Sequence, residues 1–528
     1  MDLPEIRLYV AQYLDNAQLA KAATVCKAWN TSFTPKLYRK VKWSTGRLTP
    51  QSEKMQTAFQ GKADFVRDMS LTYKRKPKGA ASLETFTHLE NIDIFFDIYD
   101  EAFWESLRRF LRQNQRIVTV KMTFGQEGDT PTQILRTLGA CCPKLKSFQV
   151  WSGSLDQKDI ELFFSATCNR LERFSMGGTY LDTGFFPRKR EATDWQLPKQ
   201  LPKLEHLYLE SSLPTLQQIA LVERCPRLKE FHWYLSEELL TDKRNAFPVF
   251  QFSKILATKC PLVEGLSLER CLLSDQGCAS IVESCQRGIS KVSFYQTKFG
   301  PLALKPLLER HSNSLTLLNL VDCLAVTSAM TQQILVSCPN LETFHSTILN
   351  AQDILGVGEG DGEDLEQIQP QNWACTNIRV LTVFITGFMS KPFHWRSLVF
   401  QQLARLERLE ELDITPQDGI MQLIPRKSIS NLRVNDCLDL RLESGLDKLS
   451  NLKRLRKLTL HNLNQAMQEK DILWMVKAWP MLKAVYGDLH HSFHVMTTLE
   501  KILNNRNIKT REEMTWFDNI FEPLQMVE

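Results

Sequence analysis

Hydrophobic residues recur along most of the chain in one spacing: an apolar residue, two variable positions, a second apolar residue, one variable position and a third apolar residue. Leu204, Leu207 and Leu209 form one such copy. Clear copies begin at residues 145, 171, 204, 228, 263, 289, 315, 378, 409, 429 and 455, and weaker ones at 66, 89, 117, 341 and 482. The median distance between successive starts is 26 residues. A constant period of this size is an internal repeat.

Each repeat predicts one strand followed by one helix. The alternation over its last three positions is typical of a short strand with one buried face, and helix-like stretches such as 216–222 and 331–336 lie between copies. One such unit cannot bury its apolar face alone, whereas stacked neighbours bury a continuous core. We therefore predict an α/β fold over residues 65–500: a solenoid of about 16 coils, with parallel inner strands and outer helices.

The first forty residues do not follow the repeat. Leu3, Ile6, Val10 and Leu14 are spaced three or four apart, which predicts one apolar helix face, and residues 19–26 predict a second helix. A module this small cannot build a comfortably stable core alone. We assign residues 1–45 to a short helical module, 46–64 to a linker and 501–528 to a C-terminal cap.

Charge and hydropathy exclude two classes of partner. The 65 Lys and Arg residues nearly balance 60 Asp and Glu residues, a net charge of +5, so we expect no nucleic-acid partner. No apolar stretch approaches the roughly 20 residues of a membrane helix, and the first residues do not resemble a signal peptide. We expect no membrane partner and a cytoplasmic location. The basic run at 74–78 keeps the nucleus as an alternative.

The chain shows no motif for catalysis. Ten of the 13 cysteines occupy two recurring positions of the repeat, which predicts small buried thiols rather than metal ligands or nucleophiles. Free thiols indicate a reducing compartment. His490 and His494 could hold zinc on a helix, but no third ligand stands near them in sequence. Phosphate-binding loops, nucleophile elbows and metalloprotease motifs are missing, so we expect no enzyme activity, cofactor or metal.

Two resemblances follow from these residues. The repeats resemble the cysteine-containing subclass of leucine-rich repeats. Residues 1–43 resemble an F-box, through Leu3-Pro4-Glu5-Ile6, Val25-Cys26-Lys27, Trp29 and Leu37-Tyr38. The same order of modules is found in fungal and other eukaryotic F-box/leucine-rich-repeat proteins.

In that family the F-box is a helical patch that docks on the small adaptor subunit of cullin–RING ubiquitin ligases. The resemblance implies a substrate-recognition subunit of an SCF-type ligase, with the adaptor, the cullin and a protein substrate as partners and no obligate homo-oligomer. Trp29 would pack inside or at the edge of the helical unit. The implied adaptor-binding residues are Leu3, Pro4, Ile6, Val10, Leu14, Leu19, Val25 and Trp29.

The alternative is a leucine-rich-repeat scaffold or inhibitor with no ligase role, whose first helices only cap the solenoid. The two hypotheses differ in one structural feature. A cap should bury Leu3, Ile6, Leu14 and Leu19 against the first coil, whereas a docking module should leave several of them exposed.

Substrate contacts are expected on the concave face of the solenoid, because side chains between the buried strand positions point there. Aromatic and imidazole side chains are the strongest candidates, since aromatic residues are enriched where interfaces are energetically important. They are His206, Tyr208, His232, Tyr234, Tyr295 and Phe384. An acidic, glycine-rich insertion near 350–372 is either a docking loop or a solvated hairpin.

Overall fold

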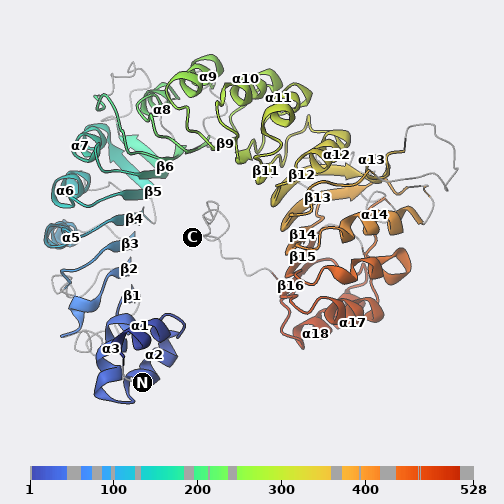
Figure 1. Cartoon of the computed structure of the whole chain (residues 1–528), viewed down its shortest axis with the longest axis horizontal. Helices are drawn as coiled ribbons and strands as arrows, with labels where there is room; N and C mark the ends of the chain where they lie inside the picture. Colours follow the sequence, from blue (N-terminus) through green and yellow to red (C-terminus); the bar gives the residue numbers. More distant parts are fainter. Residues whose placement is uncertain are drawn as a thin grey trace. The chain divides into compact units, whose positions relative to one another are not determined.

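The computed structural model describes residues 3–44, 61–73, 86–96, 101–124, 133–182, 196–211, 215–235, 247–357, 371–389, 391, 394–416, 436–461, 463 and 465–511. The chain divides into two compact units, Met1–Val263 and Glu264–Glu528. Each unit consists of parallel strands with helices between them (Figure 1).

The first unit opens with three helices, α1 (Pro4–Ala11), α2 (Asn16–Ala23) and α3 (Lys27–Leu37). Pro4 suits the first turn of α1, where the missing N–H costs nothing. Asp15 caps α2 by accepting from the Gln18 N–H at 2.8 Å, while the Gln18 side chain accepts from the Asp15 N–H at 3.0 Å. This reciprocal pair is a capping box, and it fixes where α2 begins.

Eight strands of the first unit pair in parallel and in chain order. They are β1 (Lys40–Ser44), β2 (Asp68–Tyr73), β3 (Asn91–Phe96), β4 (Thr119–Phe124), β5 (Ser147–Asp156), β6 (Arg173–Asp182), β7 (His206–Ser211) and β8 (Glu230–Tyr234). The helical segments between and after them are η1 (Ala63–Phe65), α5 (Glu101–Gln113), α6 (Gln133–Cys141), α7 (Gln157–Thr167), α8 (Thr215–Val222) and α9 (Val249–Thr258).

The second unit repeats this arrangement, and its strands also pair in parallel and in chain order. They are β9 (Gly265–Glu269), β10 (Lys291–Ser293), β11 (Leu317–Asn319), β12 (Thr343–Asn350), β13 (Val380–Thr386), β14 (Glu411–Asp413), β15 (Lys457–Leu460) and β16 (Ala484–Gly487). Its helical segments are α10 (Asp275–Ser284), α11 (Pro301–His311), α12 (Ser328–Ser337), α13 (Ala351–Leu355), α14 (His394–Ala404), η6 (Leu442–Ser444), η7 (Leu446–Asn451), α17 (Glu469–Ala478) and α18 (Phe493–Asn504).

The repeat pattern explains this architecture. Leu207 and Leu209 are two residues apart on β7, so their side chains point to the same side of the sheet, and both are buried beneath the helices. Leu318 on β11 and Leu320 just after it are also two residues apart, and both are buried. Because the register aligns these positions from strand to strand, each unit has a continuous apolar layer between sheet and helices. The predicted α/β repeat fold is confirmed.

The structure adds one strand to the predicted series. The sequence pattern places residues 40–44 in the helical module, yet β1 pairs with β2 from Lys40 opposite Asp68 to Ser44 opposite Thr72. Val41 supplies its buried position. The copy predicted at 429 and most of the acidic insertion near 350–372 lie outside the described residues. Near the end of the chain Lys509 makes an isolated parallel bridge with Ala484.

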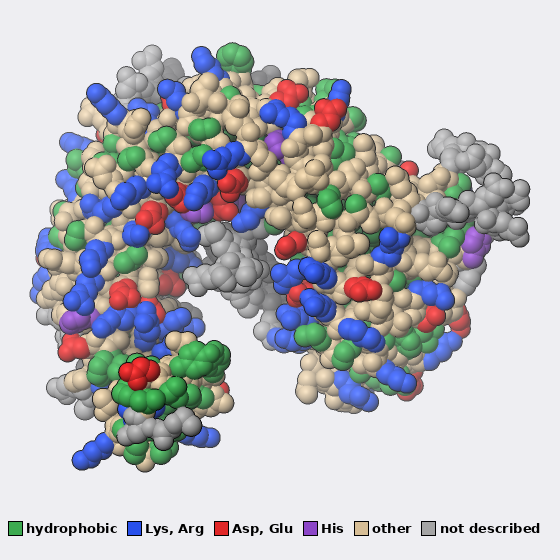
Figure 2. All heavy atoms as spheres, in the orientation of Figure 1, with side chains coloured by type: hydrophobic (Ala, Val, Ile, Leu, Met, Phe, Trp, Pro, Cys, Tyr) green, Lys and Arg blue, Asp and Glu red, His purple; other side chains and the backbone are tan. Residues whose placement is uncertain are grey.

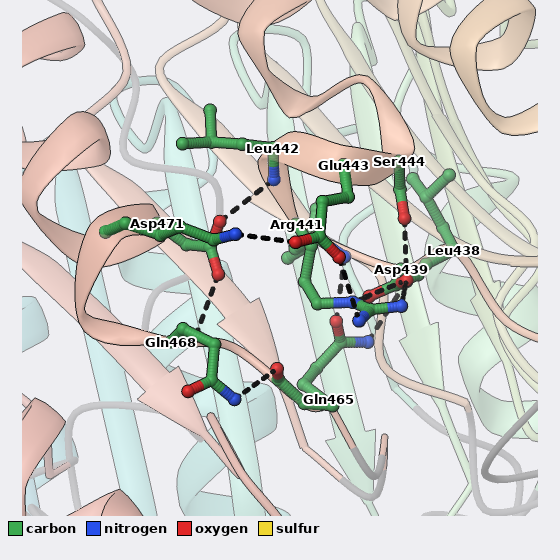
Figure 3. A network of polar contacts seen from close by, with 12 residues as sticks. Leu438, Asp439, Arg441, Leu442, Glu443, Ser444, Gln465, Gln468 and Asp471 are labelled. Carbon is green, nitrogen blue, oxygen red and sulfur yellow. Dashed lines mark hydrogen bonds and ion pairs between the residues drawn. The ribbon is translucent and has the colours of Figure 1, made fainter.

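A polar network in the second unit holds the segment 438–444 against the turn before α17 (Figure 3). Asp439 accepts from Arg441 at 2.6–2.9 Å and from the Ser444 hydroxyl at 2.6 Å. Asp471 is fully buried and accepts from the N–H groups of Leu442 and Gln468 at 2.9 and 2.8 Å. These bonds satisfy backbone donors where short 3₁₀ turns replace a full helix.

No helix among the described residues combines the length and the apolar character that crossing a membrane requires.

Candidate protein-binding surfaces

The three N-terminal helices enclose a small core of their own. Ala11, Leu19, Ala23 and Phe33 are buried at its centre. Half-buried side chains close it: Leu14, Ala22, Trp29 and Leu37. The rings of Trp29 and Phe33 meet edge to face at 5.2 Å, an arrangement that aromatic pairs favour.

Most apolar side chains of α1 lie outside this core. Leu3 is 56% exposed, Ile6 45% and Val25, between α2 and α3, 65%. Figure 2 shows hydrophobic side chains gathered on the α1–α3 module. We call these exposed side chains the apolar face: Leu3, Ile6, Leu8, Tyr9, Val10, Tyr13 and Val25. Tyr9 and Tyr13 lie one helical turn apart, and their hydroxyl groups are hydrogen-bonded at 2.8 Å.

The module contacts the first coil at the C-terminal end of α3. Lys62, just before η1, donates to the Tyr38 hydroxyl at 3.0 Å and lies 4.6 Å from the centre of its ring. Helix α3 then leads directly into β1. Leu3 and Ile6 are therefore left uncovered by the solenoid in the described part of the chain, which is the arrangement expected of a docking module rather than a cap.

The predicted adaptor-binding residues fall into three groups. Leu3, Pro4, Ile6, Val10 and Val25 are exposed. Leu14 and Trp29 are half-buried against the core. Leu19 requires a correction, because it is only 2% exposed. It packs inside the three-helix core and supports the apolar face without forming part of it.

The sheet of the first unit presents its second side away from the helices, and we call this side the open face. Side chains that alternate with the buried positions occupy it. The register sets four of them side by side on neighbouring strands, in the order Gln149, Ser175, Tyr208 and His232. A parallel row runs through Trp151, Gly177, Glu210 and Tyr234, and another through Ser147, Arg173, His206 and Glu230.

Three rings form a continuous series on this face. The Trp151 and Tyr208 ring centres are 5.2 Å apart, and those of Tyr208 and His232 are 5.7 Å apart and nearly parallel. Trp151 can reach Tyr208 because β6, the strand between them, has Gly177 at this position. A Cβ atom on Gly177 would lie 2.1 Å from the Trp151 ring. We call Trp151, Tyr208 and His232 the aromatic shelf.

Carboxylates lie on both sides of the aromatic shelf. The Tyr208 hydroxyl donates to Glu210 at 3.3 Å, and His206 Nδ1 lies 2.9 Å from a Glu230 oxygen. The structure thus brings together four of the six predicted substrate-binding residues, on the two adjacent strands β7 and β8. They are His206, Tyr208, His232 and Tyr234.

The sequence analysis missed Trp151 and Gly177. The repeat copy on β5 ends at Val150, and the repeat pattern does not mark the residue after it. Strand β5 continues to Asp156, and alternation from Gln149 places Trp151 on the open-face side of the sheet, where it is only 4% exposed. Gly177 gave no sequence signal, because its effect appears only once β5, β6 and β7 are in register.

The other two predicted residues lie in the second unit. Tyr295 is half-buried, and its hydroxyl accepts from Gln296 at 3.1 Å; burial raises the pKa of this phenol. Phe384 requires a correction, because it is 5% exposed and cannot contact a partner. A register shift between His345 and Ile348 places Phe384 opposite Ile348, and nearly all of β13 is buried on both faces.

Nine of the ten cysteines at the two repeat positions are buried as predicted, and the tenth, Cys168, is half-buried. Cys278, outside those positions, is buried as well. All 13 are free thiols, and ten are buried. Burial raises the pKa of Cys285 and Cys338 to about 12, so neither is a thiolate near neutral pH. Among the described residues no three His, Cys, Asp or Glu side chains cluster as a metal site would require. His490 and His491 stack on each other, with ring centres 4.1 Å apart.

Comparisons with known proteins give little further information. No family model matches the chain, and no curated protein matches it. One solved structure that resembles it is the complex of Rad7 and Elc1 in yeast. The match has 12% identity and a TM-score of 0.32, and covers 93% of this chain and 90% of that chain. Values this low establish neither a family nor a function.

Proposed function

We propose that this chain is the substrate-recognition subunit of an SCF-type cullin–RING ubiquitin ligase. The apolar face of α1–α3 docks on the adaptor, and the coils hold a target protein. The chain makes and breaks no bonds itself. It raises the effective concentration of target lysines near the ubiquitin-loaded enzyme. We place this role in the cytoplasm, with the nucleus as the alternative.

One observation supports the proposal most strongly. Helix α1 has a core on one side, formed with α2 and α3, and exposes Leu3, Ile6 and Val10 on the other. Exposed apolar side chains gathered on one module mark an interaction site. They agree with the F-box pattern read from the same residues, in which these positions contact the adaptor.

The test is binding of the purified full-length chain to the purified adaptor, measured by calorimetry. The variant Leu3→Ala/Ile6→Ala/Val25→Ala should weaken binding by more than about tenfold, because a few central side chains carry most of the binding energy of an interface. Its unfolding curve should stay close to that of the wild type, since all three side chains are exposed.

A matched control removes exposed leucines from the second unit. Leu272 and Leu324 are 61% and 57% exposed, so Leu272→Ala/Leu324→Ala deletes a similar apolar area far along the chain. Adaptor binding should be unchanged in this variant. If the wild-type chain does not bind the adaptor, the ligase role fails and a scaffold or inhibitor becomes the better hypothesis.

A further inference from the structure

We propose that the last two coils bind an acidic segment of the target protein through three basic side chains. We call Arg456, Lys457 and Lys483 the basic corner. Ion pairs with carboxylate or phosphate groups of the segment hold it there. This inference deepens the proposed function, on which its reference to a ligase target rests. Binding of the acidic segment itself is a property of the second unit alone.

The residues that stand immediately before each strand show what is unusual about this corner. Within each unit they form a row, because the N–H group of each donates to the carbonyl group of the one before it. We call it the starting row. Its Lys and Arg residues are Arg39, Arg67, Lys146, Lys229, Arg379, Arg456 and Lys483.

Almost every cation of the starting row is neutralised within the row. The six other than Lys483 form ion pairs with Glu90, Glu172, Glu205 or Glu410, which belong to the same row. Lys483 is exposed, and its ammonium group has no ion-pair partner among the residues that the structure describes. The charge pattern of the starting row therefore breaks at β16.

Lys483 lies between two basic residues. Its N–H group donates to the Arg456 carbonyl at 2.8 Å, and its carbonyl accepts from the Lys509 N–H at 2.8 Å. Neighbouring strands are about 4.8 Å apart, and like charges at adjacent positions destabilise a sheet. Glu410 is already shared between Arg379 at 2.8 Å and Arg456 at 3.3 Å. A charge arrangement that costs stability, and that the rest of the row avoids, indicates a binding role.

Lys457 adds a third charge beside Lys483. The register places it opposite Ala484, the residue that follows Lys483, and opposite Glu411 on its other side. Its ammonium group lies 5.5 Å from the centre of the Tyr486 ring on β16, so the side chain leans away from Glu411. Figure 2 shows Lys and Arg side chains gathered where Figure 1 places the last strands.

The basic corner suits an extended segment with several acidic side chains. The Arg456 side chain is 46% exposed, Lys483 is exposed and Lys457 is half-buried, so all three can be reached. Ion pairs between exposed groups are individually weak, and three cations on two strands can pair with more than one anionic group. The near-neutral charge of the whole chain, +5 over 528 residues, favours a protein segment over nucleic acid.

The test uses the purified full-length chain without an adaptor and measures fluorescence anisotropy of a labelled peptide of three Gly-Ser-Glu repeats. A second peptide replaces each glutamate with glutamine, which keeps the shape and removes the charge. We expect the glutamate peptide to bind about tenfold more tightly at low salt, and the difference to shrink as salt is added. A third peptide, with phosphoserine in place of glutamate, shows whether phosphate or carboxylate binds more tightly.

Two variants locate the binding. Lys483→Glu should weaken glutamate-peptide binding by about tenfold, and Lys457→Gln/Lys483→Gln should weaken it as well. The unfolding midpoint of Lys483→Glu should not fall, because the new carboxylate can pair with Arg456 as Glu410 does. The matched control is Lys298→Glu. Lys298 is an exposed lysine of the same unit that follows β10 instead of preceding a strand, and its substitution should change binding by less than about twofold.

Four results would overturn the inference. They are equal binding of the glutamate and glutamine peptides, unchanged peptide binding by Lys483→Glu, equal loss in Lys298→Glu and Lys483→Glu, and tighter binding of an oligothymidylate that Lys483→Glu also weakens. Because no adaptor is present, each result is independent of the calorimetric test of the apolar face. Peptide binding without adaptor binding would support the basic corner and reject the ligase role.

Discussion

Helices α1 and α10 are both short, yet they place their apolar side chains differently. Helix α10 buries Cys278, Ala279, Ile281 and Val282. Helix α1 buries Ala11 alone and exposes most of its other apolar side chains. The difference comes from their neighbours, because α10 packs closely on α11, whereas α1 packs less extensively on α3.

This contrast separates two uses of hydrophobic residues in one chain. In the coils an apolar side chain contributes to folding, because its burial removes surface from water. In the N-terminal module Leu3, Ile6 and Val25 contribute little to folding, because they remain in water. Stability and binding can therefore be changed separately, and three predictions follow this division from the largest effect to the smallest.

The largest expected difference is in the free energy of unfolding, between substitutions of a buried and an exposed leucine in the coils. Leu318 is fully buried on β11, and Leu324, six residues later, is 57% exposed. Leu318→Ala should lower the free energy of unfolding by about 2–5 kcal/mol, since it leaves a cavity. Leu324→Ala should change it by less than about 0.5 kcal/mol. Urea unfolding followed by circular dichroism measures both, and equal effects would contradict the assigned register.

Acid should weaken the coils through His345. Burial lowers the pKa of His345 to about 4, and its Nδ1 lies 2.8 Å from the Thr382 hydroxyl. Between the ordinary pKa of 6.5 and this value, the unfolded chain binds a proton that the folded chain does not. Stability should therefore fall as the pH is lowered from 6.5 to 4, by up to about 3 kcal/mol.

The variant His345→Gln tests this assignment, because it keeps a polar partner for Thr382 and removes the titration. Its stability should vary less between pH 6.5 and pH 4 than that of the wild type, measured by urea unfolding at several pH values. Residues 1–43 contain no histidine, so the effect should reside in the coils. An unchanged pH profile in His345→Gln would rule out this residue as the cause.

The repeat was predictable from sequence because its information is local and repeated many times. A buried strand position such as Leu207 or Leu318 is marked by its own copy and by the copies on either side. The same pattern did not mark β1, because Val41 stands within the module and its neighbouring copies are irregular. Pairing with β2 supplies the missing information, and pairing is a property of the folded chain.

The candidate binding surfaces were only partly predictable for a related reason. Leu19 and Ile6 are both apolar residues on short helices, but three-helix packing buries one and exposes the other. The aromatic shelf depends on Gly177, which lies in neither the sequence neighbourhood of Trp151 nor that of Tyr208. Alternation correctly placed Tyr208 and His232 on the open face, whereas a register shift buried Phe384.

The last prediction concerns the rates at which a disulfide reagent modifies the cysteines of the N-terminal module and of the coils. Cys26, which precedes α3, is exposed, Cys141 and Cys168 are half-buried, and the other ten thiols are buried. A buried thiol such as Cys285, with its pKa raised to about 12, has almost no thiolate to react. In the native protein a disulfide reagent at neutral pH should modify Cys26 first, and Cys26→Ser should abolish this fast phase. In urea the ten buried thiols should become reactive at the same denaturant concentration at which the coils unfold. The packing that protects these thiols from the reagent also holds each coil to its neighbours. Fast modification of the buried thiols without urea would show that the coils open locally, and the division between a stable solenoid and an exposed module would have to be abandoned.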